Sequence, residues 1–266
     1  MNEPETSELD VAWIEQQLRE LGAWLGLPLR VVAETGSTNA DAREAAARGA
    51  PHGAVFAADA QTAGRGRMGR RWHSPHGTNL YFSAVLRPSF PVSRLPAIAI
   101  AVGLATAEGI EALVPRAGLG LKWPNDVVLR GRKLAGILVE GSMCADRCEH
   151  VVVGVGVNVL QTEFDPEIRS VATSLTALGE PPSRERVLVA VLRAMSERYR
   201  QFESDGLGPM LEAVRARDVV KGRRVRVGGH EGVAEGISGG GELCVRMNGG
   251  ALRLVHAGDV ELLAPF

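Results

Sequence analysis

The chain has 266 residues, a formal net charge of −1, 45% hydrophobic residues and 23% charged residues. These values are typical of a globular protein with one large domain, or with one domain and a smaller one. They exclude a global charge that would draw the chain to nucleic acid or to a membrane surface. No apolar run has the length of a membrane span, and the acidic start lacks a signal-peptide core, so we expect a cytoplasmic protein without a membrane partner.

Hydrophobic periodicity predicts alternating helices and strands over the first four fifths of the chain. In chain order we expect a helix over 8–25, a strand over 29–33, a helix over 37–48, a strand over 54–58, a Gly/Arg loop over 62–77, a strand over 80–86, a helix over 95–113, strands over 119–123, 127–129, 134–140 and 151–159, and helices over 184–202 and 209–215.

The pattern changes after Asp218, where short apolar strands alternate with glycine turns. Five strands are expected, over 223–227, 233–237, 243–247, 251–255 and 260–262. Short strands with such turns are typical of a small barrel. We therefore predict two domains, 1–217 and 218–266.

Cysteine and lysine are both rare. The three cysteines, Cys144, Cys148 and Cys244, are an odd number without a secretory signal, which favours free thiols. Only three of the 30 basic residues are lysines. Two of them, Lys122 and Lys133, lie in one short stretch, although chance alone can produce this clustering.

The Gly/Arg loop carries four arginines and three glycines between positions 64 and 71. Glycines let the backbone approach a ligand closely, and guanidinium groups bind phosphate or carboxylate. Trp72 ends this segment and can stack on a base. The loop thus predicts a nucleotide site, against the alternative of a solvated basic loop. A Rossmann loop is excluded because no helix follows.

The segment from Lys122 to Asp126 reads Lys-Trp-Pro-Asn-Asp, a strand end followed by turn residues. Asp126 is a candidate Mg²⁺ ligand and Asn125 a candidate nucleoside contact. Lys133 follows a turn at Gly131, and the small Gly136 beyond it leaves room for a ligand. The alternative is an ordinary turn with a lysine at a strand end.

Two further clusters are weaker signals. Gly154-Val-Gly-Val-Asn158 places small residues and one amide in a buried strand, which predicts close approach of a ligand. Thr35-Gly-Ser-Thr-Asn39 places polar residues at a helix start. Helix capping alone explains that second cluster equally well.

Taken together, these motifs resemble those of the biotin protein ligase family, in the order and spacing of that family over roughly residues 30–263. The matching segments are Ser37-Thr38-Asn39, Gln61-x-x-Gly-Arg-Gly-Arg-x-Gly-Arg-x-Trp72, Lys122-Trp-Pro-Asn-Asp126, Arg132-Lys-Leu-Ala-Gly-Ile-Leu-Val-Glu140 and Gly154-x-Gly-x-Asn158.

The resemblance implies an α+β catalytic domain similar to class II aminoacyl-tRNA synthetases, followed by an SH3-like barrel. It implies that biotin and ATP, with Mg²⁺, form biotinyl-5′-AMP, and that biotin then passes to a lysine of a biotin carboxyl carrier domain.

The family pattern implies three groups of site residues. The catalytic ones are Arg67, Lys122 and Lys133. Those at biotin are Ser37, Thr38, Asn39, Gln61, Arg65, Gly66, Arg67, Lys133 and Gly136. Those at ATP are Arg65, Arg67, Arg70, Trp72, Lys122, Asn125 and Asn158, with Asp126 at the metal. We further expect the Gly/Arg loop to order only when ligand binds, since its arginines repel one another.

Several alternatives stay open. A lipoate-type ligase of the same fold is the nearest, but lipoate lacks the ureido ring that the Ser37, Thr38 and Gln61 set would bind. A non-catalytic module that binds biotin and nucleotide, or a nucleic-acid-binding module, belongs to a different class. Only 36 residues precede Ser37, and they hold no basic recognition helix, so we expect no binding of operator DNA. We expect a monomer or a weak homodimer.

Overall fold

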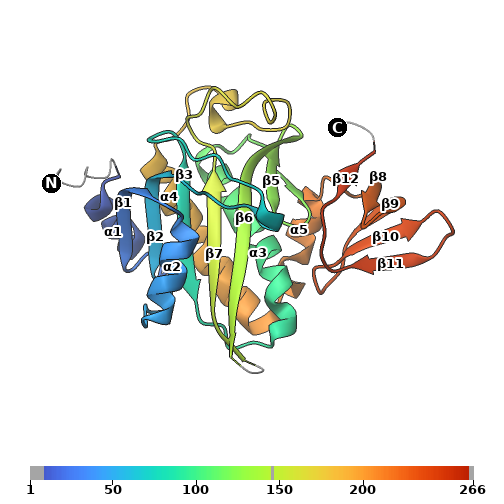
Figure 1. Ribbon diagram of the computed structural model, residues 1–266, viewed down its shortest axis with the longest axis horizontal. Helices are drawn as coiled ribbons and strands as arrows, with labels where there is room; N and C mark the ends of the chain where they lie inside the picture. The colour runs from blue at the N-terminus through green and yellow to red at the C-terminus, as the bar shows by residue number, and fades with distance from the viewer. Residues whose placement is uncertain (1–8, 145–146, 264–266) are drawn as a thin grey trace.

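The computed structural model describes residues 9–144 and 147–263, which form two sheets of very different size (Figure 1). The larger sheet has seven strands in the order β1-β2-β3-β7-β6-β5-β4. Strands β1 and β2 are parallel, and every other neighbouring pair is antiparallel. Its strands are β1 Leu29–Thr35, β2 Val55–Gln61, β3 Leu80–Leu86, β4 Gly120–Lys122, β5 Asp126–Leu129, β6 Arg132–Cys144 and β7 Arg147–Val157.

The long β6–β7 hairpin occupies the middle of this sheet, as Figure 1 shows. Its register pairs Gly136 with Gly156 and Leu138 with Gly154. Gly136 therefore lies beside Gly156, although 20 positions of chain separate them, and Gly154 lies on the same face of β7. These three glycines form a strip without side chains on one face of the sheet, which we call the glycine strip.

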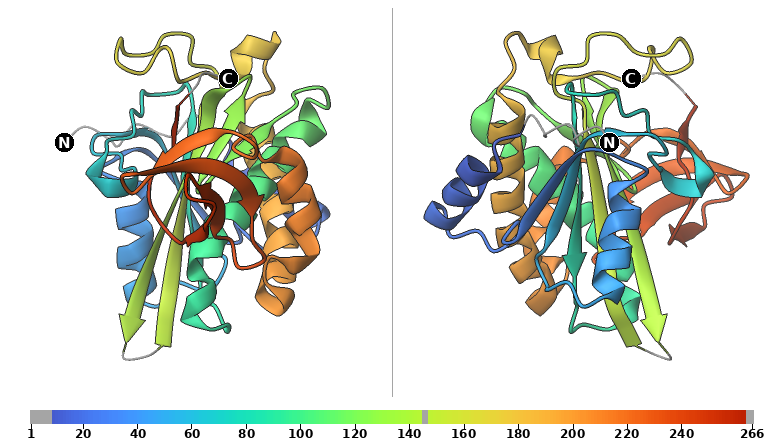
Figure 2. Two further views of the ribbon diagram at one scale, coloured as in Figure 1. Left: turned by 90° about the vertical axis from the view of Figure 1, so that its right-hand side faces the viewer. Right: turned by 60° about the vertical axis from the view of Figure 1, so that its left-hand side comes forward.

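Helices cover both faces of the larger sheet (Figure 2). One face packs α2 (Thr38–Ala47) against a small cluster that includes Val85 and Val152. The neighbouring residues of the same strands, such as Ala84 and Val153, belong to the main core. Since successive side chains of a strand point to opposite faces, this alternation is what a two-sided sheet requires. The remaining helices are α1 Val11–Glu20, α3 Leu95–Leu113, α4 Arg184–Asp205 and α5 Leu211–Arg217.

The helix α3 is apolar along nearly its whole length. Within the described residues, Val92–Leu113 is the one stretch long and apolar enough to cross a membrane by length and composition, and 72% of its apolar window is buried in the protein. It packs against α4, β6, β5 and β4. A helix that is hydrophobic all round and buried in this way is a core helix.

The smaller sheet is antiparallel, with the order β11-β10-β9-β8-β12. Its strands are β8 Arg224–Val227, β9 His230–Ile237, β10 Leu243–Met247, β11 Leu252–Val255 and β12 Glu261–Leu262. The turn before β10 contacts the larger part of the molecule, where the indole N–H of Trp123 donates to the carbonyl oxygen of Gly241 at 2.9 Å. Buried residues of both parts belong to one continuous core.

The predicted elements all occur, and their ends differ most in two places. The first helix ends at Glu20 instead of residue 25, because Gly22 adopts a left-handed backbone with φ 67°. The β6–β7 hairpin is longer than expected, since cross-strand pairing continues to Cys144 and Arg147. The acidic start of the chain lies outside the described residues.

Candidate active site

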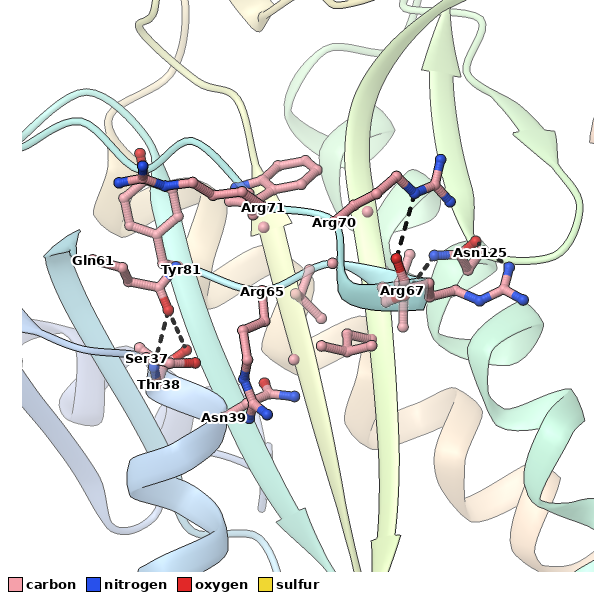
Figure 3. Close-up of a pocket in the computed structure, with 18 of the residues that line it drawn as sticks. Ser37, Thr38, Asn39, Gln61, Arg65, Arg67, Arg70, Arg71, Tyr81 and Asn125 are labelled. Carbon is pink, nitrogen blue, oxygen red and sulfur yellow. Dashed lines mark hydrogen bonds between the residues drawn. The ribbon is translucent and has the colours of Figure 1, made fainter. Parts of the chain in front are cut away.

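A narrow cavity of about 120 Å³ lies between the start of α2, the Gly/Arg loop and the hairpin β6–β7. Figure 3 shows its lining, which brings together most of the residues singled out in the sequence. The expected residues that line it are Ser37, Thr38, Asn39, Gln61, Arg65, Gly66, Arg67, Arg70, Trp72, Asn125, Lys133 and Gly136. Lys122, Asp126 and Asn158 are absent from this lining.

One end of the cavity is polar and uncharged. The backbone N–H of Thr38 donates to Oε1 of Gln61 at 2.9 Å, and Nε2 of Gln61 donates to Oγ of Ser74 at 2.9 Å. Ser37 occupies the N-cap position of α2, yet its side chain makes no capping hydrogen bond. Capping is therefore not what this hydroxyl does. Its position, buried and on the cavity wall, leaves it free to meet a ligand.

Tyr81 also lines this end, and the sequence did not single it out. Its hydroxyl donates to the carbonyl oxygen of Pro75 at 3.0 Å. Burial raises the pKa of the Tyr81 phenol well above its usual value, so the group stays neutral. The only available signal was a polar side chain within the apolar strand β3.

The Gly/Arg loop is held by contacts within itself and with other elements; that it orders only when ligand binds stays a prediction. Its backbone closes on itself, with the N–H of Gly66 donating to the carbonyl oxygen of Arg70 at 2.7 Å. The arginines do not simply repel one another, because acidic residues from other elements pair with them. Arg65 pairs with Glu140 of β6, and Arg70 pairs with Asp259 between β11 and β12, each at 2.9 Å.

The loop contacts Asn125 as well as the smaller sheet. Nη1 of Arg67 donates to Oδ1 of Asn125 at 3.1 Å, and Nδ2 of Asn125 donates to the carbonyl oxygen of Ile137 at 2.7 Å (Figure 3). The amide of Asn125 thus joins the loop to β6. Arg67 also reaches the carbonyl oxygen of Gly258 at 3.4 Å.

Trp72 fills the space that the glycine strip leaves above the sheet. A Cβ atom would lie 2.9 Å from the indole at position 136 and 2.6 Å from it at position 156. The small residues therefore admit a side chain of this chain, where the sequence suggested direct approach of a ligand. Likewise, a Cβ atom at position 154 would lie 1.9 Å from Oδ1 of Asn39. Both Trp72 and Asn39 line the narrow cavity, so these side chains form part of the surface that a ligand would meet.

A second, larger cavity of about 780 Å³ also borders Trp72. The predicted residues that line it are Arg70, Trp72, Lys122, Asp126, Lys133 and Asn158. Trp72 and Lys133 line both cavities. The ammonium group of Lys133 lies 5.2 Å from the centre of the indole ring. Arg70 and Arg71 also line both cavities, so three cations stand where the polar cavity meets the larger one.

Asp126 and Lys133 form an ion pair, with Nζ of Lys133 2.7 Å from Oδ1 of Asp126. The described residues contain no group of three or more His, Cys, Asp or Glu side chains placed to hold a metal ion. A metal at Asp126 would therefore take most of its ligands from phosphates and water, as Mg²⁺ often does at nucleotide sites.

Asn158 braces the strand ends below the larger cavity. Its buried Nδ2 donates to the carbonyl oxygen of Thr173 at 2.9 Å, and its backbone N–H donates to that of Leu134. The backbone of Lys133 bonds to both Val171 and Thr173. These contacts hold Lys133 in place from its backbone side.

Two family models match the sequence. The Biotin/lipoate A/B protein ligase family matches residues 33–158, and the Biotin protein ligase C terminal domain matches residues 221–263. Together they include the Gly/Arg loop, both lysines of the site and all five strands of the smaller sheet.

Individual relatives cover most of the chain. The biotin–[acetyl-CoA-carboxylase] ligase of Mycobacterium tuberculosis is 43% identical over 262 residues, which is 92% of this chain and 94% of the relative. The bifunctional ligase/repressor BirA of Bacillus subtilis is 37% identical over 235 residues, covering 85% of this chain and 71% of the relative.

A solved structure agrees with the fold. The biotin protein ligase from Aquifex aeolicus in complex with biotin and ATP superposes with a TM-score of 0.77 at 30% identity, covering 88% of this chain and 97% of the other. The expected α+β fold with an SH3-like final part is thereby confirmed. On these matches, the chain belongs to the biotin protein ligase family.

Proposed function

We propose that this protein is a biotin–[biotin carboxyl-carrier protein] ligase. It uses ATP to form biotinyl-5′-AMP and then transfers biotin to a lysine of a carrier domain. One observation carries this proposal: the polar cavity and the larger cavity share Trp72 and the cationic residues Lys133, Arg70 and Arg71. Two substrates that must react with each other need adjoining sites with a cation at the junction.

The uncharged end of the narrow cavity suits the ureido ring of biotin. We assign Ser37, Thr38 and Gln61 to that ring, because a neutral heterocycle needs neutral hydrogen-bonding groups. Asn39 and Gly136 complete the wall. Arg65, Gly66 and Arg67 lie over the cavity, where they would cover the bound acid.

The larger cavity suits ATP. We assign Lys122 and Arg70, which line it, to the phosphates and Asn158 to the nucleoside. Arg67 and Asn125 line the narrow cavity and would contact the phosphates and the nucleoside from that side. Trp72 would lie beside the adenine. Lys133 would hold the biotin carboxylate or the phosphate that replaces it. The carboxylate attacks the α-phosphorus and pyrophosphate leaves, so two anions must approach each other, and Arg67, Lys122 and Lys133 lower that electrostatic cost.

We propose Asp126 as the Mg²⁺ contact of the protein. Its carboxylate borders the larger cavity but is paired with Lys133. The ion, when bound, would neutralise phosphate charge. Among the described residues, Asp126 would be the one protein ligand of this ion.

The partner would be a biotin carboxyl carrier domain of a biotin-dependent carboxylase. We propose that operator DNA is not a partner, since the net charge is −1 and loop arginines are paired with Glu140 and Asp259. We further propose a cytoplasmic monomer or weak homodimer, with a domain boundary at residues 217 and 218, just after α5.

The proposal is tested by ATP–pyrophosphate exchange with Mg²⁺, using biotin, lipoate or no acid. Exchange with biotin alone is the expected result. Exchange with lipoate alone would keep the fold and overturn the substrate, because lipoate cannot use the ureido-binding groups. No exchange with either acid would remove the ligase function.

A further inference from the structure

A chain of hydrogen bonds runs from Glu140 on β6 to the wall of the narrow cavity. Nδ2 of Asn39 donates to Oε2 of Glu140 at 2.7 Å, and Oγ of Ser83 lies 2.6 Å from Oδ1 of Asn39. The same Ser83 hydroxyl lies 2.8 Å from Oγ1 of Thr38, which lines the cavity. Asn39, Ser83 and Thr38 are all buried, so none of these groups exchanges its partners for bulk water.

Glu140 determines which group donates and which accepts in each of these hydrogen bonds. A carboxylate accepts hydrogen bonds and donates none. Oε2 of Glu140 also accepts from Nη2 of Arg65 at 2.9 Å, so both partners of this oxygen, Asn39 and Arg65, are donors. Asn39 must therefore turn its NH₂ group toward Glu140 and its carbonyl oxygen toward Ser83.

The orientation of the Asn39 amide in turn determines the hydrogen-bonding roles of Ser83 and Thr38. A hydroxyl has one proton to donate, and Ser83 must give it to the carbonyl oxygen of Asn39. Ser83 can consequently only accept from Thr38, at 2.8 Å. The other acceptor within reach of the Thr38 hydroxyl is Oε1 of Gln61 at 3.2 Å, and with either partner the proton of Thr38 is not offered to a ligand. What Thr38 presents to a ligand is a lone pair.

The backbone of β7 keeps the amide of Asn39 in place. Because a Cβ atom at position 154 would lie 1.9 Å from Oδ1 of Asn39, the amide rests directly on Gly154. Packing of this kind prevents the amide from swinging out, although it does not prevent a flip that exchanges oxygen and nitrogen. The two orientations differ in their hydrogen bonds, and the acceptor at Glu140 selects between them.

We infer that Glu140 is a positioning and specificity-determining residue, which makes Thr38 an acceptor for an N–H donor of the substrate. The inference rests on the proposed function and deepens it. The ureido ring of biotin offers N–H donors, whereas the dithiolane ring of lipoate offers none. Glu140 does not line the narrow cavity, so it would favour biotin over lipoate without contacting either acid.

Two variants separate this role from a simple charge effect on Arg65. Glu140→Gln removes the charge but keeps an oxygen that can accept from both Asn39 and Arg65, as Oε2 does now. Glu140→Ala removes the acceptor, so that the amide of Asn39 is free to flip. Glu108→Ala is the matched control, because Glu108 forms a similarly exposed ion pair with Arg198 between α3 and α4, outside both cavities.

The readouts are the KM for biotin and for ATP in pyrophosphate exchange, and the preference for biotin over a cyclic carbamate analogue in which an oxygen replaces the ureido N–H that faces Thr38. We expect Glu140→Ala to raise the KM for biotin about five- to tenfold and to reduce the preference over the analogue by a similar factor. The KM for ATP should change less than about twofold, and Glu140→Gln should resemble the wild type in all three values. Thermal unfolding of each variant verifies the fold.

Equal losses in Glu140→Gln and Glu140→Ala would show that charge, and not hydrogen-bond direction, is what matters, and would overturn the inference. An unchanged preference in Glu140→Ala would also overturn it. Absence of biotin-dependent exchange in the wild type would instead refute the proposed function. In that case the hydrogen bond from the Asn39 NH₂ group to Glu140 can still be tested by NMR of the Asn39 side-chain amide in the ligand-free protein. Protected NH₂ protons in the wild type and Glu140→Gln, but not in Glu140→Ala, support it, and unprotected protons in the wild type refute it.

Discussion

The indole of Trp72 lies on the backbone of Gly156, so closely that a Cβ atom there would come within 2.6 Å of ring atom Cε2. The position of Trp72, which lines both cavities, thus depends on Gly156, 84 positions further along the chain. The arrangement depends on a missing side chain, which makes the relationship easy to test.

Gly156→Ala should displace the indole and impair adenylate formation. A shift of about 1 Å in a group that positions substrate costs up to about 100-fold in rate, so we expect exchange to fall at least about tenfold. Overpacking should also lower the free energy of unfolding by about 1–3 kcal/mol. Gly103→Ala is the control, since a Cβ atom there meets Leu121 at an ordinary 3.6 Å. It should keep full activity and add about 0.5–1 kcal/mol of stability to the helix. Wild-type exchange in Gly156→Ala would show that the position of Trp72 does not matter.

Lys133→Ala should abolish most adenylate formation without unfolding the protein. The side chain is 35% exposed, so its loss leaves no large buried void. Loss of one group that stabilises developing charge costs about 100- to 1,000-fold in rate. Pyrophosphate exchange and thermal unfolding measure the two effects separately. Lys221→Ala, which removes an exposed lysine at the start of the smaller sheet, should change neither. An active Lys133→Ala variant would contradict our assignment of this residue.

Asp259→Asn should loosen the Gly/Arg loop from the smaller sheet. Asp259 pairs with Arg70 at 2.9 Å and lies 3.8 Å from Arg67. These pairs are largely exposed, and such pairs contribute about 0.2–1 kcal/mol. We therefore expect a rise of up to about fivefold in the KM for biotin. The effect should shrink at high ionic strength, because salt screens exposed charges. Glu235→Gln breaks an exposed pair with Arg246 on the smaller sheet and should leave the KM unchanged. Equal KM values for Asp259→Asn and wild type at low salt would mean that this contact does not hold the loop.

Asp218→Asn should stabilise the protein at neutral pH but not in acid. Oδ1 of Asp218 accepts from the backbone N–H groups of Val220 and Lys221, whereas buried Oδ2 has no hydrogen-bond partner among the described residues. Burial raises the pKa of this carboxyl in the folded protein. The contribution of this carboxyl to wild-type stability is therefore greatest below the unfolded pKa and falls as the pH rises through the folded pKa.

The amide variant avoids that loss, so its advantage should be on the order of 1 kcal/mol at pH 7. The advantage should vanish below about pH 4, where the wild-type carboxyl is protonated in both states. Chemical denaturation at several pH values measures it. A difference that persists unchanged at pH 3 would rule out the carboxyl as its cause.

Local chemistry is what the sequence by itself determined. The strand Leu80–Leu86, the helix Leu95–Leu113 and the strand Leu243–Met247 match their predicted bounds, because each is an apolar run whose period and end signals lie within a few residues. The Gly/Arg loop and the Lys122–Asp126 turn were recognisable for the same reason. Their residue types and spacing reveal what such a site can bind.

Which side chains far apart in the sequence pair with one another was decided only by the tertiary structure. Arg65 pairs with Glu140, 75 positions away, and Arg70 with Asp259, 189 positions away. Nothing local in the sequence links these residues, since their encounter depends on the order of strands and on how the smaller sheet packs. The same holds for Ser83, whose role appears only when β3 brings it beside Thr38 and Asn39. A sequence lists hydrogen-bond donors and acceptors, but only the fold sets which of them meet and therefore which remain for a ligand.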